Sequence, residues 1–281
     1  VHNVNGNISI FPGNPESFRS GEPSAAPFEF SYTFNTPGDY DYRCDQHTTM
    51  RGMVHVIPDA PAVVYPVRTI GEIDDVDDLG VADSLGKKAE VTGIIYGVNM
   101  RATGISSTII DGSRDGIGIF NGTKTFGYSV KEGDRVTIRG TVDQFNGLTQ
   151  LLIDSIWLNT QNNSLHAARE VLDLDESAES DLVLMTGMSL VDAGQWIKGS
   201  TFNAMLTNGS VNVVMRVVNA TTLSAQDAPT GTFSVKGLGG QFDSSSPYTE
   251  GYQLLPRYKE DIDLFASTKS ETIASKVDVF P

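Results

Sequence analysis

Short runs rich in Val, Ile and Thr, each closed by Gly, Asn, Asp or Pro, fill most of the 281-residue chain. Runs of this kind between turn-forming residues are typical of β-strands. Helical periodicity is scarce, and only Ile73–Leu79 and Ser164–Leu172 offer short helical candidates. No apolar run approaches the roughly 20 residues that a membrane-spanning helix needs. The sequence therefore predicts an all-β protein, and we expect no transmembrane segment.

Two seams divide the chain. The first contains Pro58, Pro61 and Pro66; because proline fixes φ and removes a backbone donor, this segment is predicted to be an extended linker. The second, after Leu158, is polar and turn-prone. The predicted parts are residues 1–57, a linker at 58–66, a first barrel-like domain at 67–158, a second at 165–265 and a tail at 266–281.

The second and third parts are predicted to be divergent copies of one unit, because several short motifs recur in the same order. The matched pairs are Val91–Gly93 with Met185–Gly187, Gly133–Gly140 with Gly231–Gly237, Gln144-Phe145 with Gln241-Phe242, and Gln150–Leu152 with Gln253–Leu255.

Charge and cysteine content exclude several classes of protein. Lys and Arg number 20 against 35 Asp and Glu, a formal charge of -15, which opposes nonspecific binding to nucleic acid or an anionic membrane. The single cysteine, Cys44, cannot form an internal disulfide, a CxxC-type zinc site or an iron–sulfur cluster. It could still be a core residue, a nucleophile or a single thiolate ligand of a metal.

Soft metal ligands gather around that cysteine. His47 and Met50 follow Cys44 within seven residues, and His2 offers a second imidazole. Thiolate and thioether favour copper, and a trigonal His₂Cys plane with a weak axial Met is the blue-copper arrangement. His55 alternates with two valines, so its side chain is expected to point away from the core and away from the metal.

This segment resembles the plastocyanin-like cupredoxins, and its short ligand loop is most similar to the amicyanin type. The matching motifs are Val1–Val4, Phe18–Gly21, Phe30–Phe34, Pro37–Tyr42 and Cys44-x-x-His47-x-x-Met50-x-Gly52-x-Val54-x-Val56. The resemblance implies the C-terminal part of a Greek-key sandwich, with His2, Cys44 and His47 as equatorial copper ligands and Met50 as the axial one. Met53 is the competing axial candidate.

Such a site would carry single electrons rather than catalyse, since no position is left open for a substrate. No His-x-His pair accompanies the four histidines, so no second copper cluster is expected. The acidic surface is predicted to attract a basic redox partner, such as a cytochrome.

The segment 1–57 is shorter than a whole domain of the family it resembles. A β-sandwich of this kind needs about 100 residues, and the strands that precede the His2 motif in the family are not in this sequence. Either the sequence is a piece of a longer chain, or a neighbouring molecule donates the strands. The second case gives an alternative function, a structural subunit of an extracellular filament or surface assembly.

Residues 67–158 resemble the OB-fold domains of secreted bacterial proteins, the type annexed to extracellular nucleases. The shared phrases are Thr92-Gly93, Ile110–Gly112, Gly116–Ile119, Gly133–Val136 and Phe145–Leu148. Five strands are expected, around Ala89–Tyr96, Ser107–Asp111, Gly116–Phe120, Asp134–Val142 and Leu148–Trp157.

The two OB-like domains are interpreted as attachment or partner-binding modules, with carbohydrate binding as a further alternative. Nucleic-acid binding is disfavoured because Lys124, Lys131, Arg135 and Arg139 are scattered among acids. Arg257 is expected at a solvated strand end. No hydrolytic constellation accompanies the domains, so the chain is not predicted to be an enzyme.

An acidic run and the C-terminal tail are the remaining features of the sequence. Asp173, Asp175, Glu176, Glu179 and Asp181 form an acidic run whose spacing is not that of an EF-hand, so a solvated acidic turn is predicted rather than a Ca²⁺ site. The tail up to Pro281 resembles the opening of the type IX secretion sorting domain of Bacteroidetes-type bacteria. That resemblance implies a secreted or cell-surface protein.

Overall fold

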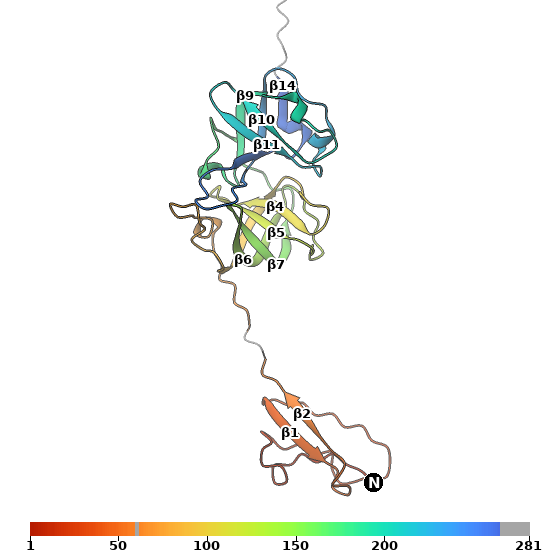
Figure 1. Cartoon of the computed structure of the whole chain (residues 1–281). Coiled ribbons are helices and arrows are strands. Elements are labelled where there is room, and N and C mark those ends of the chain that lie inside the picture. Colours follow the sequence, from red (N-terminus) through yellow and green to blue (C-terminus); the bar gives the residue numbers. More distant parts are fainter. Residues whose placement is uncertain (60–61, 265–281) are drawn as a thin grey trace, which may run out of the picture. The chain divides into compact units, whose positions relative to one another are not determined.

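The computed structural model describes residues 1–59 and 62–264. The protein is all-β, as predicted, and its helical content in this range consists of short 3₁₀ segments (Figure 1). These are η1 (Ile70–Glu72), η2 (Glu176–Ala178), η3 (Ala193–Gln195), η4 (Thr222–Ala225) and η5 (Lys259–Asp261). Within the described residues, no helix is long and apolar enough to span a membrane. The predicted sorting segment, 266–281, lies outside this range.

The chain separates into two compact units, Val1–Val63 and Val64–Pro281. The boundary falls in the proline-containing segment that the sequence predicts as a linker. Each unit is described below by itself.

The first unit is built on one hairpin, in which β1 (Gly38–Arg43) pairs antiparallel with β2 (Arg51–Val56). The N-terminal segment joins the end of β1 because Asn5 forms a bridge with Arg43. Apolar packing in this unit centres on Tyr40, which is fully buried. A T-shaped contact joins its ring to that of Phe18, with 6.0 Å between ring centroids.

The alternation of Phe28, Phe30, Tyr32 and Phe34 predicts a strand with one buried face, but the structure has no strand over 28–34. A strand requires a hydrogen-bonding neighbour, and no described segment pairs with it. Its aromatic side chains still serve packing, since the Phe34 ring lies 4.4 Å from that of Tyr40. Tyr32 is 38% exposed and Phe28 44% exposed, so the prediction of one buried face was wrong here.

The second unit begins with a closed five-stranded barrel in the ring order β3-β4-β5-β7-β6. The contact between β5 and β7 is parallel and the other contacts are antiparallel. Side chains of β-branched and aliphatic residues fill the interior. The strands are β3 (Lys88–Tyr96), β4 (Ile105–Ile110), β5 (Gly116–Asn121), β6 (Arg135–Phe145) and β7 (Leu148–Thr160).

A second barrel follows with the same connectivity. Its strand contacts run β9-β10-β11-β13-β12 and return to β9, again with one parallel contact, between β11 and β13. Two short strands extend it at β9 and β12. The strands are β8 (Arg169–Glu170), β9 (Leu182–Leu190), β10 (Phe202–Thr207), β11 (Asn212–Val217), β12 (Phe233–Gln241), β13 (Tyr252–Leu255) and β14 (Ile262–Leu264).

The motifs that recur in the sequence occupy matching places in the two barrels. Gln150 pairs with Gly118 across the parallel β5–β7 contact. Gln253 pairs with Val214 across the parallel β11–β13 contact. The two barrels are therefore built alike, and both have the Greek-key strand order of an OB-like fold.

Both helical candidates were wrong. In 73–79, the Asp77 carboxylate accepts hydrogen bonds from the backbone N–H groups of Leu79 and Val81, 2.8 and 2.9 Å long. Such local side-chain bonds offer the backbone an alternative to a helix. Within 164–172, the short strand β8 pairs with β9, so sheet hydrogen bonds replace helical ones.

The two barrels share a small apolar interface in which Tyr96 and Ile110 from the first contact Leu182 and Leu238 from the second. A buried ion pair joins them as well, since Arg257 contacts Glu132 at 2.7 Å. Arg257 is only 5% exposed, so the prediction that it lies at a solvated strand end was wrong. It is buried because an acid from each barrel neutralises it.

Candidate metal centre

Three metal-ligating side chains come together at one end of the first unit. The Cys44 Sγ lies 3.6 Å from His47 Nδ1 and 4.0 Å from His2 Nδ1. All three donor atoms lie within 4.8 Å of one another. An ion about 2.0–2.3 Å from each sulfur and nitrogen donor holds such donors roughly 3.5–4 Å apart. The trio therefore has the spacing and donor chemistry of a soft-metal site.

Main-chain pairing brings His2 to the cysteine. The N–H of Asn5 donates to the carbonyl of Arg43 (2.9 Å), and the N–H of Arg43 donates back to Asn5 (3.1 Å). This reciprocal pair fixes the N-terminal segment beside the end of β1. His2 lies three residues before Asn5, and Cys44 lies one residue after Arg43. Because the two segments are antiparallel, both residues lie on the same side of the hydrogen-bonded pair, and their side chains meet.

A tight loop places His47 and Met50. The N–H of Cys44 donates to the carbonyl of Met50, and the N–H of Met50 donates to the carbonyl of His47, both at 2.8 Å. The loop is thereby closed on itself between β1 and β2. Its length and hydrogen bonds hold the His47 ring against the thiol.

The two axial candidates differ in position. Met50 closes the ligand loop, and its side chain is 51% exposed. Met53 lies on β2, two residues before His55, so the two side chains share a strand face. His55 is paired with Asp39 on the exterior and is not among the three converging donors. Met53 therefore shares its strand face with a residue outside the donor trio, and Met50, in the ligand loop, stays the predicted axial ligand.

Hydrogen bonding prepares the Cys44 sulfur for a metal. Burial raises the pKa of the thiol, but hydrogen bonds from the backbone of Asn3, from the side chain and backbone of His47 and from the backbone of Gln46 outweigh it and lower the pKa to about 6. The group is therefore a thiolate at neutral pH, and the thiolate is the form that ligates metals.

Hydrogen bonds among polar residues next to the ligands stabilise the site. Asn3 and Asn5 are buried and donate to the two carboxylate oxygens of Asp45, at 2.8 and 2.7 Å. Arg19 also donates to Asp45, at 2.8 Å. The available signal was the alternation of Asn3 and Asn5 around a valine, which directs both amides to one side of the segment.

The donor set is asymmetrically exposed. Cys44 is 4% exposed, whereas His2 and His47 are both exposed. Their rings lie side by side, with 4.8 Å between centroids. A metal held by the trio would have its sulfur ligand inside the protein and its imidazole ligands at the surface.

No protein-family model matches the chain, and no curated protein matches it.

Proposed function

We propose that the first unit is a mononuclear copper centre that carries single electrons. The observation that supports this most directly is the convergence of His2 Nδ1, Cys44 Sγ and His47 Nδ1 within 4.8 Å. One thiolate and two imidazoles suit copper in both oxidation states. Copper held there would supply a one-electron redox couple.

The residues of the site have separate tasks in this proposal. Cys44 supplies the anionic ligand, and the hydrogen bonds to its sulfur keep it ionised. Asp45 fixes the N-terminal segment, and with it His2, against the ligand loop. The exposed imidazole edges offer the shortest route for an electron to a docked partner.

The proposed partner is a basic redox protein, such as a cytochrome. The formal charge of -15 would attract a positively charged surface and accelerate encounter at low ionic strength. The two OB-like barrels would serve attachment or partner binding.

The decisive experiment is titration of the metal-free protein with Cu(II), followed by visible absorption. We expect an intense thiolate-to-copper charge-transfer band at one copper per chain. Cys44→Ser should abolish the band, and His2→Ala or His47→Ala should weaken or shift it. His55→Ala is the matched control and should leave it intact.

A colourless copper complex, or a band that survives Cys44→Ser, would refute the proposal. The axial assignment is tested in the same titration. Met50→Leu should shift the band and raise the reduction potential, because a weak thioether ligand is lost, whereas Met53→Leu should change neither.

A further inference from the structure

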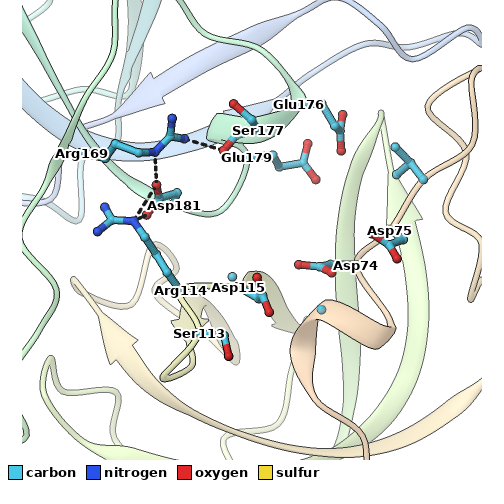
Figure 2. A pocket seen from close by; sticks show the side chains of 13 residues that line it. Asp74, Asp75, Ser113, Arg114, Asp115, Arg169, Glu176, Ser177, Glu179 and Asp181 are labelled. Carbon is cyan, nitrogen blue, oxygen red and sulfur yellow. Dashed lines mark hydrogen bonds and ion pairs between the residues drawn. The ribbon is translucent and has the colours of Figure 1, made fainter.

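A cavity of about 860 Å³ lies between loops of the two barrels in the second unit. Its lining comes from 71–76 and 113–116 on the side of the first barrel, and from Arg169 and 176–181 on the side of the second (Figure 2). This volume is in the range of small-molecule sites. Glu176, Glu179 and Asp181 in its wall belong to the acidic run that the sequence predicts as a solvated turn. Asp181 is only 5% exposed, so that prediction was wrong at this end of the run, because folding places segments of the first barrel against it.

The lining is strongly acidic. Asp181 is neutralised by two guanidinium groups, at 3.0 Å from Arg114 and 2.9 Å from Arg169, and Figure 2 shows both contacts on one wall. The other lining carboxylates form no ion pair with any described residue. They are Asp74, Asp75, Asp115, Glu176 and Glu179.

Glu179 has one carboxylate oxygen that is buried and unpaired. Its Oε1 accepts a hydrogen bond from the backbone N–H of Thr149, 2.9 Å long. Its Oε2 is buried and has no hydrogen-bond partner among the described residues. A buried, unsatisfied carboxylate oxygen is costly, and a donor entering the cavity would satisfy it.

Burial and neighbouring negative charges raise the pKa of two carboxyl groups in the cavity. Burial, together with the charge of Glu176, raises the pKa of Glu179 to about 8. Burial, together with the charge of Asp115, raises the pKa of Asp74 to about 7. A cationic ligand would relieve both effects, because it stabilises the ionised carboxylates of both barrels.

The arrangement does not suit a single chelated metal ion. Among the described residues, only the His2, Cys44 and His47 donors converge as metal ligands do. A Ca²⁺ ion with six to eight water-sized ligands, at about 30 Å³ each, fills roughly 200 Å³. The cavity is several times larger, so its carboxylates surround a polyatomic ligand better than an ion.

At Glu176 and Glu179, the free carboxylate oxygens favour ammonium over guanidinium groups. Glu179 and Glu176 each use one oxygen already, for Thr149 N–H and for the Tyr252 hydroxyl. A guanidinium binds best to two free oxygens of one carboxylate. An ammonium is a compact charge that can bond single oxygens of several carboxylates.

We propose that this cavity binds a ligand carrying two or more alkylammonium groups, supplied either by a free polyamine or by lysine side chains of a partner. The inference is independent of the copper centre, which lies in the other unit.

The test is calorimetric titration of the full chain with spermidine, with tetralysine and with Ca²⁺. We expect saturable binding of spermidine or tetralysine at one per chain. Glu179→Gln and Asp115→Asn should each weaken it at least tenfold. Glu250→Gln removes one negative charge from an exposed position outside the cavity and should leave the affinity unchanged.

The titrations with spermidine and with tetralysine distinguish the two sources of the ligand. Tighter binding of spermidine assigns the site to a polyamine, and tighter binding of tetralysine assigns it to a lysine-bearing partner. Equal affinities for the wild type and both cavity variants, with thermal unfolding showing that all are folded, would overturn the proposal. So would Ca²⁺ binding that neither amine displaces.

Discussion

At the scale of the residue, the chemistry of the first unit depends on the hydrogen bonds that the Cys44 sulfur accepts. The sulfur is buried, and burial alone would keep it protonated. Hydrogen bonds directed at it from Asn3, His47 and Gln46 reverse this and lower the pKa to about 6. Because those bonds come from the same segments that carry His2 and His47, the loop that gathers the ligands also ionises the thiol.

This ionisation is measurable without metal. In the metal-free protein, the ultraviolet absorbance of the thiolate should rise with a midpoint near pH 6 rather than at the ordinary value, about 8.5. His47→Ala removes one of the hydrogen bonds that stabilise the thiolate and should move the midpoint upward. A midpoint above pH 8 in the wild type would contradict the hydrogen-bond account.

At the scale of the element, turns and glycines determine how each barrel closes. Asn146 and Gly147 both have positive φ, at 51° and 90°, as a tight two-residue hairpin between β6 and β7 requires. The motif match pairs Gly140 on β6 with Gly237 on β12. A Cβ at Gly140 would overlap the carbonyl oxygen of Leu152, and one at Gly237 would come within 2.8 Å of the Leu255 backbone. Both glycines therefore permit a close approach of neighbouring strands.

Gly140→Ala should accordingly destabilise the second unit, by about 2–3 kcal/mol, a range typical of backbone overlap in a packed core. Gly112→Ala is the matched control, because no atom lies within 4 Å of a Cβ built there. Urea unfolding followed by circular dichroism measures both. Equal midpoints for the two variants would show that β6 and β7 can separate without cost.

At the scale of the whole second unit, a buried ion network couples the barrels. Arg257 bonds Asp261 within its own barrel, at 3.0 Å, and Glu132 of the other barrel, at 2.7 Å. Arg114 reaches from the first barrel to the carbonyl of Leu182 at the start of β9. With the shared apolar contacts, these bonds make the two barrels one compact unit.

Removing Arg257 leaves the buried Asp261 with only the longer contact to Lys236, at 3.9 Å, so Arg257→Ala should destabilise the unit by about 3–5 kcal/mol. It should also split thermal unfolding into two transitions. Lys259→Ala is the control, since the pair of Lys259 with Glu260 is exposed and contributes at most about 1 kcal/mol. A single unshifted transition for Arg257→Ala would show that the apolar contacts alone couple the barrels.

Much of the local structure could be predicted from the sequence. All five strands expected in 67–158 are present as β3 to β7, because alternating apolar residues and Asn-Gly or Asp-Gly turns act within a few residues of each other. The predicted ligand residues His2, Cys44 and His47 do converge. Copper, electron transfer, export and assembly by strand donation stay predictions.

The sequence by itself therefore determined the all-β class, the repeated five-strand pattern and the residue types around Cys44. Only the tertiary structure decided which distant groups meet. The pairing of Asn5 with Arg43 places His2 beside the thiol, and the packing of one barrel on the other sets Asp74 and Glu179 around one cavity. The reason is physical: strand patterns arise from neighbouring residues, whereas burial and charge in a site depend on chain segments that only folding brings together.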